Sequence, residues 1–269
     1  MIGPVYILTQ AELDALQPKQ LVLWQDAIQT DDYPWGFNDN AGNFQYNGAN
    51  VLRSDDNGSN LTRVPDPLGG PGFCLRHFAN MNPGARSQIG IGFPNFPALQ
   101  AQIQKPEGIF VEAEFLFPVA FTTAKPHYQW INLWDFHSVD VDMQNRQHTS
   151  PGVMLLNDGS MRCQLHWGAT LNKVNPPSAV SSIPFPVGKS CKLRMHYVWS
   201  LLPTTISLWI DDQLAIQQEG VITRLASNAN VEMYFKLYGG MNGDPDPWIP
   251  TPSVRYTRNV RISGERIWR

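Results

Sequence analysis

The stretch Lys192-Leu-Arg-Met-His-Tyr-Val-Trp199 decides the fold class, because apolar and polar side chains alternate along it. Every second residue from Leu193 to Trp199 is apolar, and most of the residues between them are polar or charged. A period of two residues is typical of a β-strand with one buried face. The stretch Ile206-Ser-Leu-Trp-Ile-Asp-Asp212 repeats the alternation, and its two final aspartates predict a turn into a following strand.

The same alternation recurs along residues 111–117 and 231–238. Asn157-Asp-Gly159 is a strong hairpin signal between residues 153–156 and 161–167. The alternating faces predict a core between two sheets. Its expected members include Leu193, Met195, Tyr197, Ile206, Leu208, Ile210, Val231, Met233, Phe235 and Leu237.

Helix signals are few. Thr9-Gln-Ala-Glu12 matches a capping box and predicts one or two helical turns over residues 11–16. A second short helix is predicted over residues 97–104. Residues 31–71 are rich in Asn, Asp, Gly and Pro, which predicts long loops.

The composition narrows the fold class further. Of 269 residues, 11% are aromatic and only 16% are charged, and there are 21 Gly and 22 Pro. This profile excludes a coiled coil and a disordered chain and favours a compact β protein. We predict an all-β fold, a single β-jelly-roll sandwich of two antiparallel sheets with minor helix. Residues 1–70 would supply a helical turn and long loops, and residues 71–269 the sandwich core.

Several classes of partner are not expected. The net charge is −3 and no basic cluster occurs, which argues against a nucleic-acid partner. Acidic residues and a proline interrupt the longest apolar stretch, residues 109–121, so no membrane span is predicted. Residues 1–10 do not resemble a signal peptide. A secreted or extracellular location is nevertheless suspected, with virion association as an alternative, and the oligomeric state is left open.

The cysteines and the ligand-type residues predict no cofactor. Cys74, Cys163 and Cys191 match no zinc pattern, and we interpret them as small buried apolar residues. One disulfide with a free thiol stays open as an alternative. No set of ligands argues for a metal. Glu112 and Glu114 share a strand face, but we interpret them as part of an exposed sheet face rather than as a glycosidase pair.

Other strand faces carry the residue types that clamp carboxylates and move protons. Arg, Gln, His and Tyr occur there in place of the Lys, Glu, Thr and Ser of an ordinary solvated sheet. These positions are Arg86, Gln88, Asp135, His137, Arg162, Gln164, His166, Glu232, Tyr234, Lys236 and Tyr238. Nearby aromatic residues, Trp130, Trp134 and Trp167, are candidates for stacking on sugar rings.

The chain resembles a known family in several segments. Gly72-Phe-Cys-Leu-Arg76 followed by Gly84-Ala-Arg-Ser-Gln88 is similar to a strand pair of jelly-roll polysaccharide lyases of heparin-lyase and alginate-lyase type. Tyr234-Phe-Lys-Leu-Tyr238 resembles their YFKxGxY segment. Residues 188–212 resemble a hairpin found across concanavalin-A-like sandwiches. The resemblance runs from about residue 70 to residue 263.

This resemblance implies recognition of an anionic, uronate-containing polysaccharide and its cleavage by β-elimination. Arg86 with Gln88 would neutralise the uronate carboxylate, and His137 would be the base. Tyr238, or Tyr234 in its place, would donate the proton or play both parts. Lys236 would lower the pKa of the nearby tyrosine by its charge.

The remaining polar residues, Asp135, Arg162, Gln164 and His166, would bind substrate together with Trp130 and Trp134. The chain departs from the family at three places: Gln88 replaces an acidic residue, Asp135 stands in place of a glutamine, and Tyr238 follows Lys236 by two residues rather than four. A second register aligns residues 129–131 with the family's Gln-Trp-His and loses the histidine. The alternative function is therefore a non-catalytic carbohydrate-binding or virion-surface protein on the same sandwich.

Overall fold

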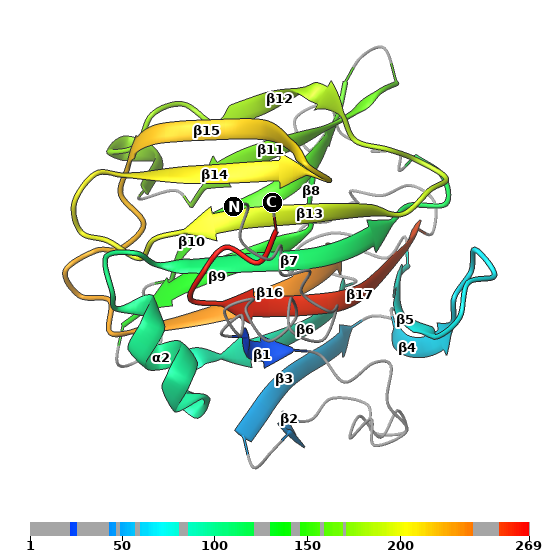
Figure 1. The fold of residues 1–269 in the computed structure, drawn as a ribbon, viewed down its shortest axis with the longest axis horizontal. Helices are drawn as coiled ribbons and strands as arrows, with labels where there is room; N and C mark the ends of the chain where they lie inside the picture. The colour runs from blue at the N-terminus through cyan, green and yellow to red at the C-terminus, as the bar shows by residue number, and fades with distance from the viewer. Residues whose placement is uncertain are drawn as a thin grey trace, which may run out of the picture.

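The computed structural model describes residues 22–25, 43–46, 49–56, 60–80, 86–120, 130–140, 146–156, 159–168, 171–238 and 253–268. Side chains are described from residue 60 onward within these ranges, apart from Arg86, Trp130, Arg146, Asn172, Lys236 and Tyr238. These parts of the chain form two antiparallel sheets stacked face to face, which confirms the predicted jelly-roll sandwich (Figure 1).

The first sheet has eight strands among the described residues. In spatial order they are β15 (Gln213–Val221), β14 (Thr204–Ile210), β13 (Cys191–Tyr197), β7 (Ile109–Leu116), β17 (Ser253–Ser263), β5 (Phe73–Ala79) and β4 (Asn60–Pro65), with β1 (Val22–Gln25) paired to β17. β17, red in Figure 1, pairs with β7 along one edge and with β5 and β1 along the other. The C-terminal strand of the described chain therefore holds the middle of this sheet together.

The second sheet has nine strands in the described part of the chain. In spatial order they are β12 (Ala179–Pro184), β11 (Met161–Trp167), β10 (Arg146–Leu155), β9 (Trp134–Val139), β16 (Asn230–Tyr238), β6 (Arg86–Gly92), β3 (Ala49–Asp56) and β2 (Asn43–Tyr46), with β8 (Trp130–Asn132) paired to β10. The helical elements are α2 (Pro97–Ile103) and the short 3₁₀ turns η1 (Phe93–Asn95) and η3 (Leu171–Lys173).

The core lies between the two sheets. All ten residues predicted to face it are buried there, which confirms the assignment of the alternating faces. Contacts across the core join the sheets directly: the ring of Phe136 on β9 stacks on Tyr197 of β13, with ring centroids 3.9 Å apart. Aromatic pairs of this kind add to the stability gained from burying apolar area.

Two local predictions from the sequence are confirmed. The turn between β14 and β15 falls at Asp211, whose φ of 53° is left-handed and whose carboxylate accepts a hydrogen bond from the backbone N–H of Lys192 at 2.9 Å. Aspartate tolerates this conformation better than most residues. Helix α2 lies where a short helix was predicted and begins at Pro97, a residue favoured in the first turn of a helix.

Other predictions fare differently. The loops expected over residues 31–71 are wrong in part, because β2, β3 and β4 lie within this range and pair into the sheets. Backbone hydrogen bonds join β2 to β3, β3 to β6 and β4 to β5. These strands carry no clear alternation of apolar residues, so the sequence pattern gave no signal. The helix predicted over residues 11–16 lies outside the described residues, and the single domain over residues 1–269 stays a prediction.

The three cysteines, Cys74, Cys163 and Cys191, are buried and free, as interpreted from the sequence. Burial raises the pKa of the Cys74 thiol to about 11 and that of the other two thiols as well. None of the described helices combines the length and apolar character needed to cross a membrane.

Candidate functional site

The strand register gathers the sequence-predicted polar residues on one face of one sheet. Leu237 and Phe235 of β16 point into the core, so the residues that alternate with them take the outward positions. β16 pairs with β6 so that Tyr238 lies opposite Arg86 and Lys236 lies opposite Gln88. We call this outward side of the nine-stranded sheet the outer face.

The outer face continues from β16 onto β9 and β10. Tyr234 lies opposite Asp135, and Glu232 lies opposite His137. His137 in turn lies opposite His148 of β10. Three adjacent strands therefore bring a carboxylate, two imidazoles and a phenol together, although they are far apart in the sequence.

Asp135 and His137 are buried although they point away from the core. Asp135 is 0% exposed and His137 is 4% exposed. The Nε2 atom of His137 lies 3.2 Å from Oδ2 of Asp135, and its ring meets the ring of His148 edge-on, with centroids 4.1 Å apart. A carboxylate next to an imidazole fixes its orientation and stabilises its protonated form.

Tyr234 forms the other side of this cluster. Its hydroxyl donates to Oε2 of Glu232 at 2.7 Å, and its ring lies 4.9 Å from that of His137. The ring covers Gly90 on β6, where an added Cβ would collide with it. A glycine at this position makes room for the tyrosine, so β6 and β16 together set the position of the phenol.

A second polar group lies farther along the same sheet. His166 pairs with Ser150 in the register, and its Nε2 atom lies 2.6 Å from Oδ1 of Asn132. Gln164 follows two residues earlier on β11, also on the outer face. The guanidinium of Arg162 donates to the carbonyl oxygen of Ser182, so this arginine links β11 to the edge strand β12.

Two of the aromatic candidates are in the core, and their expected role as sugar-stacking surfaces is wrong. Trp134 is 0% exposed and packs against Phe115 and Phe235, at 5.6 and 5.8 Å between centroids. Trp167 is also buried, and its indole N–H donates to the carbonyl oxygen of Pro176 at 2.8 Å. The reason is alternation: if Asp135 faces outward, its neighbour Trp134 faces inward.

Four candidate residues are placed by backbone alone: Arg86, Trp130, Lys236 and Tyr238. Their side chains lie outside the described part of the structure. Their register positions are on the outer face, with Trp130 opposite Met154 of β10. The expectation that the tips of Arg86, Gln88, His137 and Tyr238 meet on one sugar stays a prediction.

Sequence reasoning missed His148. The start of β10 reads Arg146-Gln-His-Thr-Ser-Pro and shows no apolar alternation, so no strand was predicted there. The only available signal was the hairpin at residues 157–159, from which β10 can be traced back along its pairing with β11.

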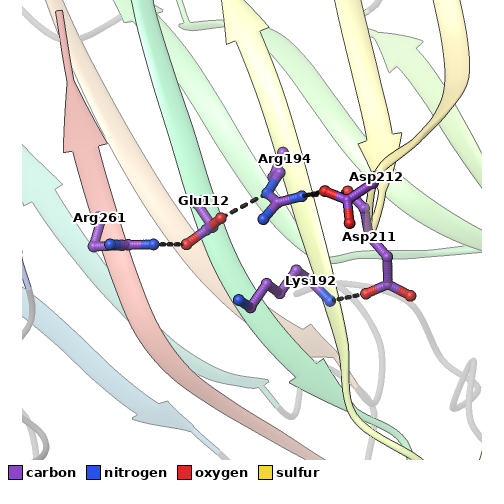
Figure 2. Close-up of polar contacts among 6 residues, drawn as sticks. All are labelled: Glu112, Lys192, Arg194, Asp211, Asp212 and Arg261. Atoms are coloured by element: carbon purple, nitrogen blue, oxygen red, sulfur yellow. Dashed lines mark hydrogen bonds and ion pairs between the residues drawn. The ribbon is translucent and has the colours of Figure 1, made fainter. Parts of the chain in front are cut away.

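The opposite, eight-stranded sheet also carries charge on its outward side, but the charges there are paired. Figure 2 shows Glu112 between Arg194 and Arg261. Arg194 also reaches Asp212 at 2.7 Å. Burial opposes the ionised form of Glu112, but the two arginines outweigh burial and hold its pKa below the usual value. The expectation of an exposed acidic pair is therefore wrong for Glu112, because the arginines flank and cover its carboxylate.

A second set of ion pairs lies on the same sheet. Glu114 pairs with Arg258 at 2.7 Å, and Arg258 also reaches Asp66 at 2.6 Å. A hollow of about 340 Å³ opens beside Lys192, Arg194 and Asp212, and two of these residues, Arg194 and Asp212, form an ion pair with each other. The outer face of the nine-stranded sheet remains the better candidate.

Comparisons with known proteins support the fold. No protein-family model matches the chain, and no curated protein does. Among solved structures, an endo-β-1,4-glucuronan lyase from the fungus Trichoderma reesei superposes with a TM-score of 0.54 at 12% identity, over 83% of this chain and 93% of the lyase. A carbohydrate esterase from Shiga toxin-encoding bacteriophage phi24B superposes with a TM-score of 0.53 at 8% identity, over 90% of this chain and 98% of the esterase. The chain thus has the concanavalin-A-like jelly-roll sandwich fold that the resemblance to polysaccharide lyases implied.

Proposed function

We propose that the protein binds a uronate-containing polysaccharide on the outer face of the nine-stranded sheet and cleaves it by β-elimination. A base takes the proton from C5 of the uronate, and the electron pair left behind forms the C4–C5 double bond. The bond from C4 to the linking oxygen breaks, and an acid protonates that oxygen. The chemistry needs a group that neutralises the carboxylate, a base and an acid.

The observation that carries the proposal is the register of β6 against β16. Arg86 lies opposite Tyr238, and Gln88 lies opposite Lys236. The carboxylate of a uronate is bonded to the same C5 that loses the proton. The residue that binds the carboxylate and the residue that transfers the proton must therefore lie side by side. Arg86 and Tyr238 do so in the backbone register, because they are paired across β6 and β16.

We assign both proton transfers to Tyr238: it would remove the proton from C5 and then protonate the linking oxygen. A lysine at position 236 favours the tyrosinate by its charge. His137, the base expected from the sequence, is less suited, because its Nε2 atom faces Asp135 at 3.2 Å and its ring is buried. Tyr234 is the second candidate for the acid, and its hydroxyl is engaged by Glu232.

The rest of the outer face would bind neighbouring sugars. Gln164, His166 and Trp130 occupy outward positions on β11 and β8, beyond the cluster on β9 and β16. Arg162 would contribute from the edge of the sheet. A chain of several sugars needs an extended face of this kind. The fold shared with a glucuronan lyase supports the proposal, and an extracellular location is part of it.

The experiment is a cleavage assay on the full chain with a panel of uronate polymers, including glucuronan and alginate. Elimination creates an unsaturated uronate, so the ultraviolet absorbance rises with turnover. The expected result is a rise with at least one polymer and none with a neutral glucan. Binding without any rise in absorbance, across the panel, overturns the lyase and favours the non-catalytic carbohydrate-binding module.

A further inference from the structure

Three side chains of the outer face converge in a way that the sequence did not reveal: Asp135, His137 and His148. One ligand atom from each lies within 4.8 Å of the other two. Oδ2 of Asp135 is 3.2 Å from Nε2 of His137 and 3.9 Å from Nδ1 of His148. We propose that these three residues form a binding site for a divalent transition-metal cation.

The distances suit a single cation. Metal–nitrogen and metal–oxygen bonds to Zn²⁺ are about 2.0–2.2 Å, so ligand atoms around a tetrahedral ion lie roughly 3.3–3.6 Å apart. The pair Asp135–His137 is already near this spacing. His148 has to move inward, because its Nδ1 atom is 3.9 Å from Oδ2 of Asp135 and the three ligand atoms span up to 4.8 Å. Its side chain is 37% exposed and has room to shift.

The ligand types select the class of metal. Two imidazoles with one carboxylate suit Zn²⁺ and other first-row transition metals, whereas Ca²⁺ and Mg²⁺ prefer sites built from oxygen atoms. Asp135 is fully buried, so its carboxylate offers a ligand that is shielded from bulk water.

Neighbouring residues restrict where the two histidines can lie. The backbone N–H of Gly168 donates to the carbonyl oxygen of His148 at 2.9 Å, which fixes the backbone that carries this residue. Gly168 also leaves room for the ring, since a Cβ there would lie 3.1 Å from Cδ2. The ring centroid of Tyr234 lies 4.9 Å from that of His137.

Three protein ligands leave a coordination position open, as in zinc sites that bind a water or a substrate atom. If the proposed function holds, a uronate carboxylate on the outer face is the substrate group of suitable chemistry for this position. That last step rests on the proposed function, whereas the metal site itself does not. With His137 as a ligand, both proton steps stay with Tyr238.

The experiment titrates Zn²⁺ into the full chain after dialysis against a chelator, with isothermal calorimetry and no polysaccharide. The variant is His148→Gln, which changes the most exposed ligand. The matched control is His196→Gln, a histidine on the eight-stranded sheet whose Nε2 atom lies 2.7 Å from the carbonyl oxygen of Glu107. We expect one Zn²⁺ per chain in wild type and control, and affinity weakened at least about tenfold in His148→Gln.

Cobalt gives a second readout. Co²⁺ bound by imidazole and carboxylate in a four- or five-coordinate site absorbs visible light strongly, and this absorbance should appear in wild type and be lost in His148→Gln. Equal Zn²⁺ affinity in wild type and His148→Gln, or no binding in wild type, overturns the proposal. The titration contains no polysaccharide, so a failed cleavage assay would not affect the metal site. Likewise, a failed titration would not affect the proposed cleavage.

Discussion

The guanidinium of Arg255 on β17 crosses the core and donates to the carbonyl oxygen of Leu133 at 3.0 Å. Leu133 is the residue between β8 and β9, and Arg255 also donates to the carbonyl oxygen of Asn132 at 3.2 Å. This fully buried arginine of the eight-stranded sheet thus holds the backbone of the other sheet just before β9, the strand that carries Asp135 and His137.

Replacing this arginine should destabilise the fold strongly. Arg255→Met keeps much of the volume but leaves two buried carbonyl groups without their donor, and each buried acceptor left unsatisfied costs about 1–3 kcal/mol. Urea unfolding measures the change. Arg76→Met is the matched control, because Arg76 is half-buried and its hydrogen bond to Asn60 is long, at 3.3 Å. Equal stability of the two variants would contradict the role of Arg255.

Acid should destabilise the protein through two groups whose effects begin at different pH values. Burial, and next the charge of Arg255, hold the pKa of His77 well below its ordinary value of 6.5. The folded state therefore favours the neutral imidazole. This contribution to the free energy of unfolding is complete above pH 6.5 and falls as the pH drops below that value.

Glu112 is the second group. Its pKa is held below the ordinary 4.5, so its contribution is complete above pH 4.5 and is lost as the pH falls through the lower folded value. Urea midpoints measured against pH should lose the first decline in His77→Gln and the second in Glu112→Gln. His196→Gln serves as the control, and a first decline as steep in His77→Gln as in wild type would disprove the assignment.

Trp134 should matter for stability. Truncation of a buried aromatic residue to alanine costs about 3–5 kcal/mol, because it removes apolar contacts and leaves a cavity. Trp134→Ala should show this loss in urea unfolding. Leu202→Ala, at a side chain that is 72% exposed, should change stability by no more than about 0.5 kcal/mol. A small effect at Trp134 would remove it from the core.

Gly90 and Tyr234 should be coupled. Gly90→Ala places a methyl group against the tyrosine ring and should destabilise the fold by about 1–3 kcal/mol through overpacking. In a Tyr234→Ala background the same substitution should cost much less, since the obstructing ring is gone. A double-mutant cycle by thermal or urea unfolding measures the interaction. Additive effects would show that the ring does not lie over the glycine.

Tyr238→Phe tests the proposed chemistry. The change removes only a hydroxyl, so folding and polymer binding should change little, while turnover should fall by about 10²–10⁴-fold. Arg86→Ala should lower both rate and affinity, since pairing with a carboxylate acts in the ground state and the transition state alike. Tyr256→Phe, on β17 of the other sheet, is the control. Full turnover in Tyr238→Phe would move the role to Tyr234.

The fold was predictable because local pattern and burial agree. Leu193, Leu208 and Phe235 each lie in an alternating run, and each is in the core. Strands β3 and β4 were not predictable, since sheet pairing there uses backbone groups and their sequences show no alternation of apolar residues. The inward direction of Trp134 followed from the outward direction of Asp135 and could have been read from the same alternation.

The candidate site was predictable only strand by strand. Asp135 and His137 share a face by their spacing, as do Glu232 and Tyr234. That β9 lies between β16 and β10, which brings His148 to His137, depends on pairings between distant segments. No local pattern in one sequence encodes that order, so the three-residue cluster emerged only from the structure.

The position of β17 has a consequence for synthesis of the chain. Residues 253–263 are made after every other described strand, yet they join β7 to β5 and β1 in the eight-stranded sheet. Until they leave the ribosome, the described strands of this sheet form three unjoined groups: β15 to β7, β5 with β4, and β1. Each group exposes a strand edge that β17 covers. Folding of the eight-stranded sheet is therefore completed only after residues 253–263 have been made, and until then its exposed strand edges can associate with other chains.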